Sequence, residues 1–118
     1  MGGSVGMFEL LREDRVLGVV REVEHGAEVE NFENNRVINP LAGKNRLSRA
    51  ELKDFLASRC FPETRWNKKE LLRLGGLSFY DPYQIVQKTH GVMVDDCYWI
   101  RFDGENLTWD DIKHLRGV

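Results

Sequence analysis

The 118-residue chain has few cysteines, few prolines and no long apolar run. No stretch approaches the roughly 18 consecutive apolar residues that a transmembrane helix needs, and no signal-peptide pattern opens the sequence. We therefore expect a cytoplasmic protein without a membrane segment. The two cysteines, Cys60 and Cys97, stand far apart, and neither has a second cysteine at metal-ligand spacing. This spacing indicates reduced thiols rather than a disulfide or a zinc site.

The sequence also lacks the patterns on which common catalytic sites depend. Gly75-Gly76 is not followed by the Gly-Lys-Ser/Thr run of a phosphate-binding loop. The histidines His25, His90 and His114 are single and scattered, so none has an obvious nucleophile beside it. We expect His90 to stabilise the end of a helix instead. The sequence therefore predicts a protein that is not an enzyme and holds no cofactor.

Two pairs of adjacent aspartates are candidates for a metal site. They are Asp95-Asp96 and Asp110-Asp111. Neighbouring side chains point to opposite faces of a strand and to diverging directions on a helix, so neither pair forms a chelate by itself. We expect the first pair to shape a turn and the second to begin a helix, and we predict no bound metal.

What is present is ordinary globular composition, with 42% hydrophobic and 31% charged residues. We expect a single domain over residues 7–118. Residues 1–6 (MGGSVG) resemble an expression leader, which makes Met7 the expected natural start.

Charge is unevenly distributed, although the formal net charge is only -2. Residues 1–33 hold three basic and eight acidic side chains, and residues 74–118 hold four and seven. Residues 34–73 reverse the balance, with ten basic and four acidic side chains. The middle of the chain is therefore its basic part.

The local patterns predict an α+β fold that begins with strands. Residues 7–33 are rich in valine, phenylalanine and alternating charge, and Glu28, Glu30 and Glu33 alternate with Val29 and Phe32. Turn residues stand at Glu13-Asp14 and His25-Gly26. This predicts a three-stranded antiparallel meander near 7–12, 16–24 and 27–32. Residues 34–46 are expected to be a connecting loop.

Helix signals dominate the remainder. Ser48 and Glu51 form a capping box that predicts a helix of about ten residues with Leu52, Phe55 and Leu56 inward. A second short helix over 67–74 is expected to bury Leu71, Leu72 and Leu74 and to stop at Gly75-Gly76. Asp81-Pro82 begins a third helix that ends near Thr89 and is closed by Gly91. A strand over 97–102 and a last helix from Thr108 follow. The expected fold is therefore the opening meander, three to four short helices and one further strand.

The basic middle, residues 36–73, is one candidate binding surface. Its cations are interleaved with Phe61 and Trp66, and cations with a stacking aromatic can bind nucleic acid through its phosphates and bases. The candidate residues are Arg59, Arg65, Trp66, Lys68, Lys69 and Arg73. The alternative is a solvated face neutralised by nearby acids, and a pI of about 5.9 favours that alternative.

Aromatic residues crowd the chain after residue 79 and form a second candidate surface. Tyrosine and tryptophan dominate the energetic centres of protein interfaces. The candidates for binding a protein are Tyr80, Tyr83, Asp95, Asp96, Tyr98, Trp99 and Trp109. The alternative is a core built from large side chains.

Residues 47–112 resemble a known region of a kinase family. The matching runs are LSRAELKDFL from Leu47, SRCFPETR from Ser58, a leucine-rich helix, Tyr80-Asp81-Pro82, Thr89-His90-Gly91, DDCYWI from Asp95 and LTWDDI from Leu107. Together they are similar to the non-catalytic N-terminal region of HipA-like kinases from Firmicutes. The kinase signature itself, with its phosphate loop and catalytic and metal-binding aspartates, is missing here.

The resemblance implies a regulatory module that binds a protein, an antitoxin-like partner of a HipA-like kinase in a bacterium. Nucleic-acid binding through residues 36–73 stays open as an alternative. A third hypothesis is a mobile-element inhibitor of a host nucleoprotein, of the anti-CRISPR or anti-restriction type, with the Glu-rich strands imitating phosphates.

Overall fold

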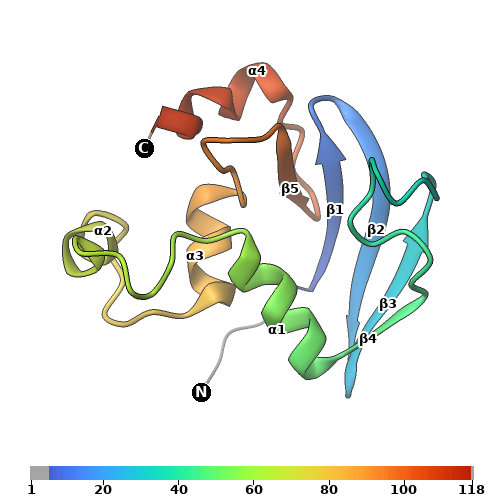
Figure 1. Cartoon of the computed structure of the whole chain (residues 1–118), viewed down its shortest axis with the longest axis horizontal. Coiled ribbons are helices and arrows are strands. Elements are labelled where there is room, and N and C mark those ends of the chain that lie inside the picture. The colour runs from blue at the N-terminus through green and yellow to red at the C-terminus, as the bar shows by residue number, and fades with distance from the viewer. Residues whose placement is uncertain (1–5, 118) are drawn as a thin grey trace.

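The computed structural model describes residues 6–117 and contains one antiparallel sheet with helices on both of its faces (Figure 1). The strands are β1 (Met7–Arg12), β2 (Arg15–Val23), β3 (Gly26–Asn31), β4 (Arg46–Ser48) and β5 (Tyr98–Phe102). The helices are α1 (Arg49–Ser58), α2 (Lys68–Leu74), α3 (Pro82–Thr89), α4 (Trp109–Ile112) and the short 3-10 helix η1 (Lys113–Gly117). The predicted leader falls mostly on residues 1–5, outside the described residues.

The sheet confirms the α+β class and the opening meander, but it has five strands in the order β4-β3-β2-β1-β5. The prediction of a loop over residues 34–46 is wrong at its last residue, because Arg46 begins β4. Residues Arg46–Ser48 pair with β3 because Leu47 lies opposite Ala27 and is buried. The late strand β5 pairs with β1, so it forms the edge of the sheet beside the first strand.

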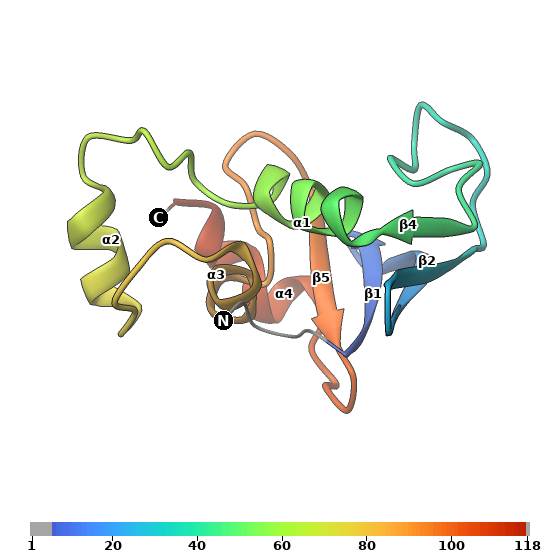
Figure 2. The ribbon, with the colours of Figure 1, turned by 90° about the horizontal axis from the view of Figure 1, so that it is seen from below.

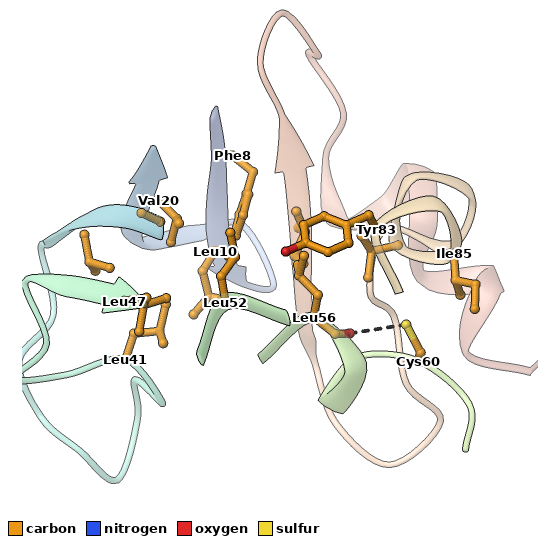
Figure 3. Close-up of a cluster of buried hydrophobic side chains, with 14 of the residues drawn as sticks. Phe8, Leu10, Val20, Leu41, Leu47, Leu52, Leu56, Cys60, Tyr83 and Ile85 are labelled. Atoms are coloured by element: carbon orange, nitrogen blue, oxygen red, sulfur yellow. Dashed lines mark hydrogen bonds between the residues drawn. The ribbon is translucent and has the colours of Figure 1, made fainter. Parts of the chain in front are cut away.

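The larger core lies between one face of the sheet and helices α1 and α3 (Figure 3). Phe8, Leu10 and Val20 project from the sheet toward Leu52 of α1, while Tyr83 and other residues of α3 fill the adjoining space. Cys60 belongs to this core, and burial raises the pKa of its thiol to about 12, so it stays neutral. Both cysteines are free thiols.

A smaller core occupies the opposite face of the sheet. Leu11 and Trp99 face each other across β1 and β5 and pack against Trp109 and Ile112 of α4. Because α1 covers one face and α4 the other at this end of the sheet, neighbouring residues of β5 are buried on both sides. In Figure 1, α4 is drawn above β5 and α1 below it.

The helix starts form as their local sequences predict. Ser48 Oγ accepts from the Glu51 amide at 3.0 Å, while Glu51 accepts from the Ser48 amide at 2.9 Å. Asp81 caps α3 by accepting from the Tyr83 amide at 3.0 Å. The stop of α3 differs, since His90, with φ of 56°, takes the left-handed position one residue before Gly91.

The free edge of β5 is closed by bonds from outside the sheet. Its amides alternate, and the three that point away from β1 all have acceptors. Tyr98 donates to the Asp96 carboxylate at 3.1 Å, Ile100 to the His90 carbonyl at 2.7 Å and Phe102 to the Glu105 carboxylate at 2.7 Å. The outward amides of β5 are therefore not available to pair with another strand.

Within residues 6–117, none of the helices combines the length and the apolar composition that crossing a bilayer requires.

Candidate binding surface on the α2 lobe

Residues 61–80 form an excursion between α1 and α3 that we call the α2 lobe. Figures 1 and 2 both show α2 at the end of the molecule remote from the strands. The lobe is closed at its base, where the rings of Phe61 and Tyr80 meet edge to face at 5.6 Å. The Tyr80 hydroxyl donates to the Phe61 carbonyl at 2.7 Å. Burial raises the pKa of Tyr80 to about 12, which keeps this donor protonated.

The C-terminus of α2 is fixed by a left-handed glycine. The Leu77 amide donates to the Leu72 carbonyl at 2.8 Å, and the Gly76 amide donates to Arg73 at 3.0 Å. This pair of bonds is a Schellman motif, which needs a residue with positive φ, and Gly76 has φ of +73°. The predicted glycine stop is therefore confirmed, and it brings the apolar side chains of Leu72 and Leu77 together.

A shallow hollow of about 450 Å³ lies beside this turn. Its lining residues come from α2 and from the segment that returns toward α3: Lys69, Leu72, Arg73, Gly76, Leu77 and Ser78. Leu72 is buried, whereas Lys69 and Arg73 are exposed. The hollow thus combines apolar side chains with two cations.

Large apolar side chains are displayed on the lobe. Trp66 is 89% exposed, Leu74 67% and Phe79 52%. Contiguous exposed apolar surface marks binding sites in many soluble proteins, and these three side chains lie on one lobe. The lobe is therefore the strongest candidate binding surface in the described chain.

The expectation that Leu71, Leu72 and Leu74 are all inward is wrong for Leu74, and Leu71 is only partly buried. An α-helix turns about 100° per residue, so Leu72 and Leu74 point about 160° apart and cannot face one core. This spacing was visible in the sequence and could have identified Leu74 as a surface residue.

Four cations of the lobe make no ion pair with any residue of the range 6–117. They are Arg65, Lys68, Lys69 and Arg73, and the lobe's own acids, Glu63 and Glu70, are not within ion-pair distance of them. Five cations elsewhere have carboxylate partners: Arg15 with Glu33, Lys44 with Glu51, Arg59 with Asp96, Arg101 with Glu9 and Lys113 with Asp110. The other lysines and arginines of residues 6–117 form no ion pair, as on the lobe. The expected local neutralisation therefore does not occur on α2.

Arg59 lies apart from the other candidates for nucleic-acid binding. Its guanidinium donates to both carboxylate oxygens of Asp96 at 2.8 Å and to the carbonyls of Gly91 and Tyr98 at 2.9 and 3.0 Å. Burial opposes ionisation of Asp96, but the hydrogen bond and charge of Arg59 outweigh it and lower the pKa of Asp96. This pair holds the fold together, while Arg65, Trp66, Lys68, Lys69 and Arg73 lie on the lobe.

Several candidates for protein binding lie in the core. Trp99 has an exposed fraction of 0%, and its indole donates to the Glu13 carbonyl at 2.6 Å. Tyr83 and Trp109 are also buried. Since a buried ring has no surface to offer, these three aromatics are available to the core and not to a partner of the folded chain.

The remaining candidates do not form one surface with them. Asp95 is exposed in the turn before β5, and Asp96 is partly buried against Arg59. The Tyr98 hydroxyl donates to the Ile38 carbonyl, and Tyr80 closes the base of the lobe.

Three of the four aspartates in the acidic pairs, Asp96, Asp110 and Asp111, have partners within the fold. Asp110 forms an ion pair with Lys113 at 2.9 Å, and Asp111 accepts from the Thr108 amide at 2.7 Å. Across residues 6–117, no three His, Cys, Asp or Glu side chains gather as a metal centre would require.

The glutamates of the meander are interleaved with arginines. Glu28 and Glu30 are exposed on β3, but Arg21 of β2 stands opposite Glu28. Glu9 of β1 binds Arg101 at 2.8 Å. A phosphate-imitating surface needs charge of one sign, and this face of the sheet carries both.

No protein-family model, curated protein or solved structure matches the chain.

Proposed function

We propose that the protein is a non-enzymatic regulatory module that binds a protein partner through the α2 lobe. The observation that carries this proposal is the exposure of Trp66, Leu74 and Phe79 on one lobe. Exposing them to water is unfavourable, and a partner that buries them gains that free energy at about 25 cal/mol per Å² of apolar area. Tryptophan is also the residue most enriched at the energetic centres of interfaces.

The resemblance to the N-terminal region of HipA-like kinases makes a kinase of this family the first partner to test. A separate chain of this kind would restrain the kinase by occupying the surface that its own N-terminal region uses, in the manner of an antitoxin. The lobe falls inside the resembling segment, which spans residues 47–112.

The test measures binding of the purified chain to a HipA-like kinase from the same host by titration calorimetry. Trp66→Ala combined with Leu74→Ala should weaken binding at least tenfold, since interface anchors cost more than about 1 kcal/mol when truncated. Val37→Ala is the matched control, because Val37 is as exposed as Trp66 but lies outside the lobe.

A second readout covers partners outside the kinase family. Proteins that co-purify with the wild-type chain from host lysate are compared with those retained by the lobe variant. A partner retained equally by both chains would contradict binding through the lobe.

The unpaired cations favour nucleic-acid binding as a second candidate function. Lys68, Lys69 and Arg73 could follow a phosphate backbone while Trp66 stacks on a base. Fluorescence anisotropy of labelled oligothymidine would then rise at low salt, fall steeply as salt is added, and lose its response when the three cations are changed to Gln. A flat titration at low salt would exclude this function.

A further inference from the structure

We infer that the hollow beside α2 receives a segment of the partner in which an acidic residue adjoins an apolar one. This inference rests on the proposed function and specifies the chemistry of the partner at the same surface. It depends on the hollow formed by the turn at Gly76 and on the cations that line it.

The shape of the hollow follows from the Schellman turn. The bond from Leu77 to Leu72 folds the chain back against α2, so apolar atoms of both leucines line the hollow. Gly76 leaves it open, since an added Cβ there would meet nothing within 4 Å. An aliphatic or aromatic side chain of a partner fits such a lining by burying apolar area on both sides.

The two charged side chains that line this hollow, Lys69 and Arg73, are both positive. Lys69 and Arg73 are four residues apart on α2 and hence on the same face. Like charges at this spacing repel each other, and neither side chain has an ion-pair partner within residues 6–117. A carboxylate placed between them would remove the repulsion and add two attractive contacts.

An acidic peptide fits these features better than a nucleic acid. A phosphate backbone would satisfy Lys69 and Arg73, but it would leave Leu74 and the partly buried Leu77 uncovered. The formal net charge of -2 for the whole chain also opposes a polyanion, whose repulsion acts over the full molecule. A short segment with one or two carboxylates meets only the local cations.

The experiment selects short peptides from a displayed random library on the immobilised full-length chain. Selected peptides should carry Asp or Glu beside Leu, Phe or Trp. Their affinity, measured by fluorescence anisotropy, should fall about tenfold in Lys69→Glu/Arg73→Glu and should weaken with added salt. Lys69→Gln/Arg73→Gln neutralises the two charges without reversing them, so it should lower the affinity of the peptides by a smaller factor.

Lys53→Glu/Lys88→Glu is the matched control. It changes the net charge equally at two exposed lysines on α1 and α3, away from the hollow. The affinity of the selected peptides for this control variant should stay within about twofold of their affinity for the wild type, because solvent ions screen exposed charges at a distance. Circular dichroism and thermal unfolding of each variant confirm that the fold is retained.

Selected peptides without acids, or peptides that bind Lys69→Glu/Arg73→Glu as well as they bind the wild type, would overturn the inference. If such peptides still require Trp66, the proposed function stands and only the acidic character of the partner is wrong. Oligothymidine that binds more tightly than any peptide and displaces the peptides would also overturn it, in favour of nucleic acid. If neither peptides nor the kinase depend on any lobe residue, the proposed function fails as well.

Discussion

Arg59 is the residue on which three segments of the chain depend. It stands at the end of α1 and reaches Asp96 before β5, the carbonyl of Gly91 after α3 and that of Tyr98 within β5. A guanidinium has five donors in a planar arrangement, which lets one side chain satisfy these acceptors together. A lysine at this position would satisfy fewer of them.

We predict that Arg59→Met lowers the free energy of unfolding by about 3 kcal/mol, because it leaves a partly buried carboxylate and two carbonyls without their donor. Urea denaturation measures the change. Lys88→Met, at an exposed residue of α3, is the control and should stay within about 0.5 kcal/mol of the wild type. A loss below about 1 kcal/mol for Arg59→Met would show that water replaces the guanidinium.

The same pair predicts a dependence of stability on pH. The pKa of Asp96 is lowered from 3.8 in the folded chain, since Arg59 outweighs the effect of burial. A depressed folded pKa gives stabilisation that is complete above the unfolded pKa and is lost as the pH falls through the folded value. The melting temperature should therefore fall as the pH decreases below about 4.

Arg59→Met should show a shallower fall over the same acid range. The pKa values of Glu33, Glu51 and Asp111 are also lowered, so the wild-type curve alone does not isolate Asp96. The difference between the two curves is the measurement. Parallel curves would mean that Asp96 contributes nothing to acid unfolding.

At the scale of elements, the helix starts were predictable because their bonds are local. Ser48 with Glu51 and Thr108 with Asp111 each join residues three apart, so their hydrogen bonds depend on short-range sequence. Strand β4 was missed for the opposite reason. It has three residues with one apolar side chain, Leu47, too few for any alternation to be visible.

Two glycines near helix ends, Gly76 and Gly91, distinguish two costs of adding a side chain: the strain of a positive φ and the crowding of the new Cβ by its neighbours. Gly76 has φ of +73° and open space around it, whereas a Cβ at Gly91 (φ +66°) would lie 3.1 Å from Ile100 Cδ1 and 3.2 Å from Arg59 Cβ. We predict that Gly76→Ala costs about 1 kcal/mol, from φ alone. Gly91→Ala should cost about 3 kcal/mol, from φ and crowding together.

Chemical denaturation of the two alanine variants provides the comparison. Equal losses would mean that Ile100 and Arg59 move aside without cost and that only the backbone conformation matters.

At the scale of the whole molecule, the sequence could not decide which aromatic residues are buried. Alternation in β5 separates Trp99 from Ile100, and a strand covered on one face would expose one of them. Both are buried because α4 packs on the second face, and this contact joins segments that no local pattern connects. The basic residues around Trp66, in contrast, could be predicted from the sequence to lie on the surface. A charged side chain stays in water unless another segment covers it, so this prediction needs no knowledge of distant contacts.

Two tryptophans test this division between core and surface. Trp99→Ala should lower the free energy of unfolding by about 4 kcal/mol, as expected when a large buried ring is removed. Trp66→Ala should change it by less than about 0.5 kcal/mol while weakening binding of the partner. Chemical denaturation measures the free energy of unfolding of both variants, and calorimetry measures their binding to the partner. A large stability loss in Trp66→Ala would show that its ring packs on the body.

The occupied edge of β5 has a consequence for how this molecule meets others at high concentration. Strand exchange and fibre growth begin where a sheet offers a row of vacant amides. Here one edge has its three outward amides engaged, and the opposite edge is three residues long, with the Ser48 amide held by Glu51. Backbone-templated polymerisation therefore has little to start from. Contacts with other molecules therefore depend on side chains rather than on the pairing of sheet edges.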